Sequence, residues 1–122
     1  MTYNTSFASK YGNKRTEHNG RSFMSKFEAR IAGELELELK AGKYVAIEYQ
    51  YKIPLYVYLP DGKKAQLFNY ICDFRCEKPD GSFVLIEAKG HITDAYRTKR
   101  KILDLVWLPD HKNYEFQEVR MK

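Results

Sequence analysis

Three charged side chains lie in segments whose composition predicts buried β-strand. Asp73 lies within AQLFNYICDFRCE, and Glu87 and Lys89 lie at the end of FVLIEAKG. Charges inside a sheet are costly unless they are paired or bind a metal. Alternation along a strand places Glu87 and Lys89 on the same face. The turn KPDGS joins the two segments, so Asp73 can lie beside Glu87 across an antiparallel pair.

Such a pair of carboxylates predicts a site for a divalent cation. The two negative charges repel each other unless a cation lies between them. Their oxygens suit Mg²⁺, with Mn²⁺ as a substitute, because Mg²⁺ retains water and takes one or two carboxylates together with phosphate oxygens. Lys89 adds a compact cation that can hold an attacking hydroxide or stabilise negative charge in a transition state. The alternative is a hairpin with a surface Glu–Lys pair.

The first element that must position these residues is a helix. The segment RSFMSKFEARIAGELELELKAGK has an apolar residue at every fourth position, namely Phe27, Ile31, Leu35 and Leu39. Ser25 is the predicted N-cap, and Gly42 suits the C-terminal stop. The stretch ELELEL also alternates like a strand, but Glu and Leu favour helix.

The remaining segments predict three strands, a second helix and a last strand. YVAIEYQYKIPLYVYL, AQLFNYICDFRCE and FVLIEAKG are rich in β-branched, aromatic or apolar residues, and the turns PDGKK and KPDGS separate them. TDAYRTKRKILDLVWL predicts a helix that Pro109 ends, and NYEFQEVRM predicts the final strand. The predicted order is α-β-β-β-α-β, an α/β fold. The large apolar side chains from Tyr44 to Tyr58 could support a dimer or belong to the core.

Length and composition predict one domain, because the chain has 122 residues, of which 43% are hydrophobic and 30% charged. Residues 1–22 are polar and basic and predict a flexible N-terminal arm ahead of a single domain at residues 23–122. The sequence shows neither a signal-peptide segment nor an apolar run of the roughly 20 residues that a membrane span needs. We therefore expect a cytoplasmic protein. Cys72 and Cys76 are predicted to be small buried side chains.

The net charge of +5 is concentrated in two basic clusters. One lies in residues 1–30 and the other at the start of the second helix. Basic clusters on both sides of an acidic centre indicate a polyanionic partner, nucleic acid first, although an ordinary solvated surface is the alternative. The side chains that we expect to contact DNA are Lys14, Arg15, Arg21, Lys26, Arg97, Lys99, Arg100 and Lys101.

The spacing of the charged residues resembles the motif of the PD-(D/E)XK nucleases: Asp73, thirteen residues, and then Glu87-Ala-Lys89. Cys72-Asp73 stands where the family has Pro-Asp. The resemblance implies a restriction-endonuclease-like αβββαβ core, with a mixed central sheet flanked by helices, in a nuclease domain at residues 23–122. In many nucleases of this fold an acidic residue on the first helix reaches the metal site, which makes Glu28 a candidate. Ser25-x-x-Glu28 is also a capping box.

Residues 20–103 resemble the endonuclease I type of phage Holliday-junction resolvase more closely. The shared features are Ser-x-x-Glu at the first helix, an aromatic strand with Lys-x-Pro, Asp-Phe, and Glu-x-Lys-Gly after a short loop. The segment resembles equally a poorly characterised group of small phage proteins with the same core. The chain lacks the long basic C-terminal extension of the resolvases.

The resemblance to the resolvases implies the site residues and the partners. The implied catalytic set is Glu28, Asp73, Glu87 and Lys89, and the implied metal ligands are Asp73, Glu87, Glu28 and the Ala88 backbone carbonyl. It further implies a homodimer that acts on DNA in the bacterial host cell.

These observations predict a Mg²⁺-dependent endonuclease of phage type that hydrolyses phosphodiester bonds, with branched DNA as the preferred substrate. One alternative is a nuclease of the same fold for other phage DNA processing or nicking. The other is a catalytically inactive nucleic-acid-binding module.

Overall fold

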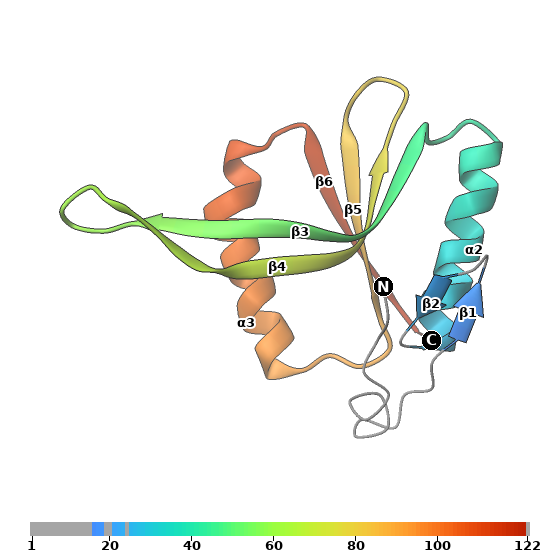
Figure 1. Cartoon of the computed structure of the whole chain (residues 1–122), viewed down its shortest axis with the longest axis horizontal. Helices are drawn as coiled ribbons and strands as arrows, with labels where there is room; N and C mark the ends of the chain where they lie inside the picture. Colours follow the sequence, from blue (N-terminus) through green and yellow to red (C-terminus); the bar gives the residue numbers. More distant parts are fainter. Residues whose placement is uncertain (1–15, 19–20, 24, 122) are drawn as a thin grey trace.

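The computed structural model describes residues 16–18, 21–23 and 25–121 (Figure 1). Its main elements are helix α2 (Lys26–Lys40), strands β3 (Ala46–Tyr58), β4 (Lys64–Glu77) and β5 (Phe83–Lys89), helix α3 (Asp94–Ile102) and strand β6 (Tyr114–Arg120). The predicted order α-β-β-β-α-β is therefore confirmed. None of the helices in the described residues is long and apolar enough to cross a lipid bilayer.

A short hairpin precedes α2. Strand β1 (Thr16–His18) pairs antiparallel with strand β2 (Arg21–Phe23). The predicted flexible arm covers residues 1–22, so all of this hairpin except Phe23 lies within it. Lys14 and Arg15 lie outside the described residues.

Helix α2 begins where the sequence predicts. The Ser25 hydroxyl caps it by accepting a hydrogen bond from the Glu28 N–H at 3.1 Å. The helix continues through Lys40, so the ELELEL stretch is helical, and Gly42 follows with a φ of 86° that suits glycine. The apolar residues that this helix buries against the sheet include Phe27, Ile31 and Leu35.

The strands β3 to β6 form one mixed sheet in the order β3-β4-β5-β6. The first three strands pair antiparallel, whereas β5 and β6 pair parallel, with α3 in the crossover that a parallel connection requires. Helix α2 packs on one face of the sheet, and α3 with the turns after it packs on the other (Figure 1). Strand β5 is covered on both faces, which explains its nearly continuous apolar sequence.

Strands β3 and β4 bend at Gln50 and Asp73. Tyr49 and Phe74 pack in the core under α2, whereas Cys72, which alternation would place on the same face as Phe74, packs in the core under α3. Gln50 has a φ of 54°, a left-handed conformation that costs a residue with a side chain about 1–2 kcal/mol. The β3–β4 ladder pairs Tyr49 with Phe74 and skips the position of Gln50 and Asp73.

Beyond this bend the two strands leave the sheet as a two-stranded ribbon, which we call the projecting ribbon and which spans residues 51–72. Figure 1 shows that it extends past α3, on the side of the molecule away from α2. Its inward side chains, including Ile53, Leu55 and Tyr70, are buried together with Leu103. The base of the ribbon is therefore anchored in the core.

The second helix does not continue as a regular α-helix to Pro109. After α3 come a π-helical turn (Leu103–Trp107) and a 3₁₀ turn (Leu108–Asp110). The Leu108 N–H bonds to the Leu103 carbonyl, five residues back. Proline has no N–H to continue the α-helical pattern, and its ring blocks the preceding turn. The α-helix therefore ends at Ile102 and not at Pro109 as predicted, and Pro109 lies within the 3₁₀ turn that follows the unpredicted π-helical turn.

The wide turn places Leu103 in the core, fully buried, and leaves Leu105 68% exposed. Leu103→Ala should therefore lower the free energy of unfolding by about 2–5 kcal/mol, because it leaves a cavity. Leu105→Ala, the matched control, should lower it by less than about 0.5 kcal/mol. Denaturant titration of both variants measures the difference, and equal losses would contradict this orientation of the turn.

Candidate active site

The candidate site lies where β4 parts from β5. Their antiparallel ladder runs from Glu77 opposite Phe83 to Phe74 opposite Ile86, and it stops there. Asp73 is the next residue of β4 and Glu87 is the next residue of β5. Their carboxyl groups hydrogen-bond to each other. Asp73 therefore lies beside Glu87, as the sequence predicts.

Side chains replace the backbone ladder where the two strands separate. The Asp73 carboxylate accepts a hydrogen bond from the Ala88 N–H at 2.8 Å. The Cys72 thiol lies 3.4 Å from the Ile86 carbonyl oxygen and can donate to it. Buried backbone groups need such partners, because leaving them without a hydrogen bond is costly. Cys72 and Cys76 are free and buried, as predicted.

Burial sets the protonation of the carboxyl pair. Glu87 is only 4% exposed, and its carboxyl accepts a hydrogen bond from the Tyr70 hydroxyl at 3.1 Å. Burial, followed by the charge of Asp73, raises the pKa of Glu87 to about 9. Burial also raises the pKa of Asp73, against the opposing effect of the hydrogen bonds from Glu87 and the Ala88 N–H. Without a cation, the pair therefore shares one proton at neutral pH.

Lys89 lies on the same face of β5 as Glu87. Its ammonium is 3.9 Å from a Glu87 carboxylate oxygen and 4.2 Å from the centre of the Tyr96 ring. The Tyr96 hydroxyl donates to Glu118 at 2.7 Å, and Arg120 donates to the same carboxylate at 2.6 Å. Tyr96 therefore forms a fixed platform under the lysine, and nothing in the sequence alone connects it to the site.

Glu28 and Gln50 form a second part of the site. Glu28 is buried, and its carboxylate accepts a hydrogen bond from the Gln50 side-chain amide at 3.2 Å. Gln50 also hydrogen-bonds to Asp73 and lowers the pKa of that carboxyl. The helix cap uses the backbone N–H of Glu28 and the hydroxyl of Ser25, so the Glu28 carboxylate can face the sheet. Gln50 is the bridging residue that sequence reasoning missed.

The described residues fit a hard cation only in part. Within residues 16–18, 21–23 and 25–121, no group of three or more His, Cys, Asp or Glu side chains could hold a metal ion. Asp73 and Glu87 supply two adjacent carboxyl groups, which is the number that Mg²⁺ commonly takes, with backbone oxygens, water or phosphate as the other ligands. Glu28 reaches this pair through Gln50, and its role as a direct ligand stays a prediction.

The residues that we expected to contact DNA have different surroundings. Lys26, Lys99 and Lys101 are exposed, and Arg97 is exposed and paired with Asp94 at 3.2 Å. Arg100 instead lies 3.7 Å over the Phe116 ring. The side chain of Arg21 is outside the described part of the structure, as are Lys14 and Arg15. DNA contact by all eight stays a prediction.

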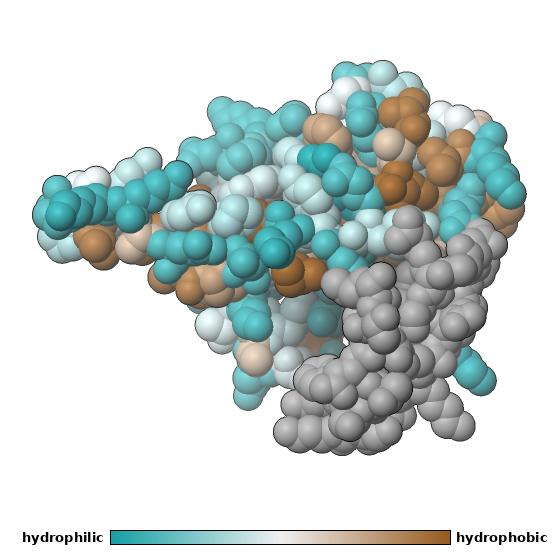
Figure 2. Space-filling model, viewed as in Figure 1, coloured by the Kyte–Doolittle hydropathy of each residue, from teal (hydrophilic) through white to brown (hydrophobic). Residues whose placement is uncertain are grey.

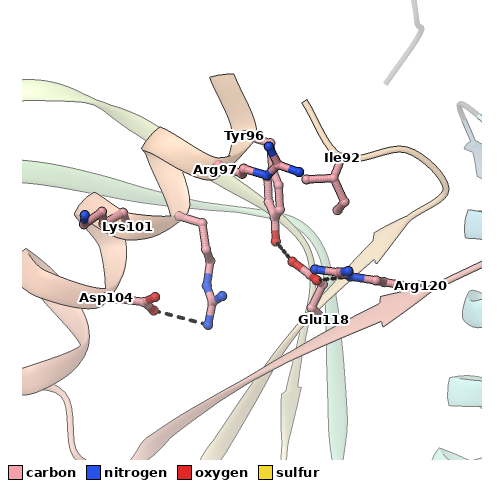
Figure 3. Close-up of a pocket in the computed structure, with 8 residues that line it drawn as sticks. Ile92, Tyr96, Arg97, Lys101, Asp104, Glu118 and Arg120 are labelled. Atoms are coloured by element: carbon pink, nitrogen blue, oxygen red, sulfur yellow. Dashed lines mark hydrogen bonds and ion pairs between the residues drawn. The ribbon is translucent and has the colours of Figure 1, made fainter. Parts of the chain in front are cut away.

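A pocket of about 270 Å³ lies between α3 and the end of β6 (Figure 3). Tyr96 lines it and connects it to Lys89. In Figure 3 the Glu118 carboxylate lies between Tyr96 and Arg120. The charged residues lining the pocket are the cationic Arg97, Arg100, Lys101 and Arg120 and the acidic Asp104 and Glu118. The excess of cationic groups suits an anion such as a phosphate.

Comparison with known proteins defines the family of this chain. Residues 8–122 match a family model described as "Protein of unknown function (DUF1064)", and the chain belongs to that family. No curated protein and no solved structure matches the chain.

The metal-free protein should lose stability as the pH rises from about 5 to about 9. The unfolded chain releases the Glu87 proton near the ordinary pKa of 4.5, whereas the folded protein keeps it until about pH 9. Between these values the unfolded state binds fewer protons, so the free energy of unfolding falls by up to about 1.4 kcal/mol per pH unit. Glu87→Gln, which imitates the protonated acid, should remove this part of the slope.

Denaturant titrations in EDTA at about pH 5, 7 and 9 measure the effect. Glu115→Gln, at an exposed position of β6, is the matched control and should keep the wild-type slope. A wild-type slope equal to that of Glu87→Gln would contradict the shared proton.

The two roles of Glu28 can be separated by substitution. Ser25→Ala removes the cap and should cost about 1 kcal/mol of stability without changing Mg²⁺ affinity. Glu28→Gln keeps the backbone N–H that the cap uses but weakens the connection to Asp73, so Mg²⁺ binding should weaken about 10- to 100-fold. Calorimetric titration measures both affinities, and unchanged binding by Glu28→Gln would limit this residue to a structural role.

Proposed function

We propose that this chain is a Mg²⁺-dependent endodeoxyribonuclease with a restriction-endonuclease-like core of the PD-(D/E)XK kind. The observation that carries the proposal is geometric. Asp73 lies beside Glu87 where β4 and β5 part, and the Lys89 ammonium lies 3.9 Å from the Glu87 carboxylate. The order of these residues, and the strands that bear them, are those that the nuclease motif requires.

Asp73 and Glu87, with the Ala88 carbonyl and Glu28, are the proposed ligands of Mg²⁺ or Mn²⁺. When bound, the ion supplies positive charge that neutralises the scissile phosphate and lowers the pKa of water. Lys89 donates hydrogen bonds toward the attacking water and the phosphate oxygen on which negative charge develops. The position of its ammonium between Glu87 and the Tyr96 ring orients it for this role.

The proposed reaction is hydrolysis of the DNA backbone. A bond forms between the water oxygen and phosphorus, and the bond between phosphorus and the 3′ oxygen breaks. One water proton ends on the 3′ oxygen, so the products are a 5′ phosphate and a 3′ hydroxyl. Gln50 has a positioning role, because its amide joins Glu28 to Asp73.

The finer proposal is a homodimeric Holliday-junction resolvase of phage type that acts in the bacterial cytoplasm. Its support is the resemblance of residues 20–103 to the endonuclease I resolvases and the basic surface of α3, where Arg97, Lys99 and Lys101 are exposed. Nicking or other processing of phage DNA uses the same site on another substrate. A binding module of this fold needs neither the carboxyl pair nor Lys89.

Cleavage of a labelled four-way junction and of its linear duplex arms, with Mg²⁺ and with EDTA, tests the proposal. Asp73→Asn and Lys89→Ala should each lower the cleavage rate by at least about 10²-fold, because each removes a group that acts on the reacting phosphate. The controls are Asp110→Asn and Lys112→Ala, at exposed positions with the same charge changes, and they should cleave like the wild type.

Metal-dependent cutting of the junction alone, lost in both site variants, would support the resolvase. Equal cutting of both substrates would support the nuclease activity and contradict a preference for junctions. DNA binding without cutting under any metal condition would replace the nuclease with the binding module.

A further inference from the structure

The projecting ribbon, residues 51–72, has an excess of cationic side chains. It carries Lys52, Lys63 and Lys64, and Asp61 is its one acidic residue. The Asp61 carboxylate accepts the Lys63 N–H at 2.9 Å and belongs to the turn. None of the acidic side chains in the described part of the chain forms an ion pair with the ribbon lysines. This surface is therefore positive and open to an anionic partner.

In each cross-strand pair on the outer face of the ribbon, a polar side chain lies opposite an apolar or aromatic one. These pairs are Lys52 with Ile71, Pro54 with Asn69, Tyr56 with Gln66, and Tyr58 with Lys64. All of these side chains are exposed, Tyr58 at 77%, and Lys64 lies 4.2 Å over the Tyr56 ring. Figure 2 shows hydrophilic residues over the outer end of the ribbon and smaller hydrophobic areas along one edge.

This pattern argues against a second copy of the chain as the partner. The cores of protein interfaces are depleted of charged residues, and obligate interfaces are more apolar still. Here a lysine stands in the first and in the last cross-strand pair, and amides stand between them. Cationic, amide and tyrosine side chains on one face are the groups that contact DNA phosphates and base edges.

We infer that the projecting ribbon is a DNA-binding element that lies in the major groove of the duplex that the site cuts. The major groove, about 12 Å wide, admits a two-stranded β-ribbon. The inward face of the ribbon is fixed in the core by Leu55 and Tyr70, so it is ordered before DNA arrives. The inference rests on the proposed function in taking DNA as the partner.

The length of the ribbon sets the reach of this contact. From Tyr51, next to Gln50 of the candidate site, the ladder extends to Tyr58. Eight residues at about 3.3 Å each span about 26 Å, which corresponds to about eight base pairs of B-DNA. The tip lysines should therefore contact the duplex about eight base pairs from the cut phosphate.

The first test compares the triple variant Lys52→Ala, Lys63→Ala, Lys64→Ala with wild type in binding to a linear duplex, in EDTA, over a range of salt concentrations. The slope of log affinity against log salt should become shallower by about one unit for each lysine that contacts a phosphate. Affinity near 0.1 M salt should fall at least about tenfold. Lys112→Ala removes an exposed lysine in the turn before β6, is the control and should leave the slope unchanged.

The second test places a photocrosslinker on Lys63→Cys, which is practical because Cys72 and Cys76 are buried. Crosslinks to duplex DNA about eight base pairs from the cut site, absent from Lys112→Cys, support the inference. Unchanged affinity and salt slope in the triple variant would overturn it. Crosslinks between two protein chains, with a monomeric triple variant in sedimentation, would also overturn it and assign the ribbon to a dimer interface.

These outcomes separate the inference from the proposed function. Binding in EDTA does not need cleavage. A salt slope that depends on the ribbon lysines, in a protein that never cuts DNA, would therefore support the ribbon as a DNA-binding element and contradict the proposed nuclease activity. Cleavage that depends on Asp73, together with ribbon variants that bind DNA like the wild type, would support the nuclease and contradict the DNA-binding role of the ribbon.

Discussion

One hydrogen bond, from the Ala88 N–H to the Asp73 carboxylate, holds the place where β4 and β5 separate. Without a side-chain acceptor, the parted strands would leave a partly buried backbone N–H without a partner. Asp73 supplies that acceptor, and by doing so it is fixed beside Glu87. The hydrogen bond that gives the Ala88 N–H an acceptor where β4 and β5 separate therefore also orients the Asp73 carboxyl group. The Cys72 thiol completes the arrangement at the Ile86 carbonyl.

The carboxyl pair is the electrostatic consequence of this geometry. Two buried acids cannot both ionise at low cost, so burial and mutual repulsion raise the pKa of Glu87 to about 9. Lys89 lies 3.9 Å from Glu87 and is partly held by the Tyr96 ring, so it offsets only part of that cost. A proton and a divalent cation can each neutralise the pair. An arrangement that weakens the folded state on its own is typical of a functional site rather than of a structural ion pair.

The bend at Gln50 and Asp73 connects the candidate site to the rest of the molecule. Gln50 adopts a left-handed backbone conformation and hydrogen-bonds to Glu28 and Asp73. At this residue the inward side chains of β3 change from the core under α2 to the core under α3. Strain of this kind persists only where the surrounding contacts fix it. Past the bend the same two strands become the projecting ribbon. The carboxyl pair and the lysine-bearing ribbon are therefore parts of one continuous hairpin.

The sequence by itself determined the main elements from α2 to β6, their order, the cap at Ser25 and the shared face of Glu87 and Lys89. These follow from periodicity, cap chemistry and strand alternation, which act over a few residues. It also placed Asp73 beside Glu87, because a short turn sets the register. Only the tertiary structure decided the bend at Gln50, the platform under Lys89 and the π-helical turn before Pro109. These features depend on packing between segments far apart in the chain, and a local sequence pattern does not predict such packing.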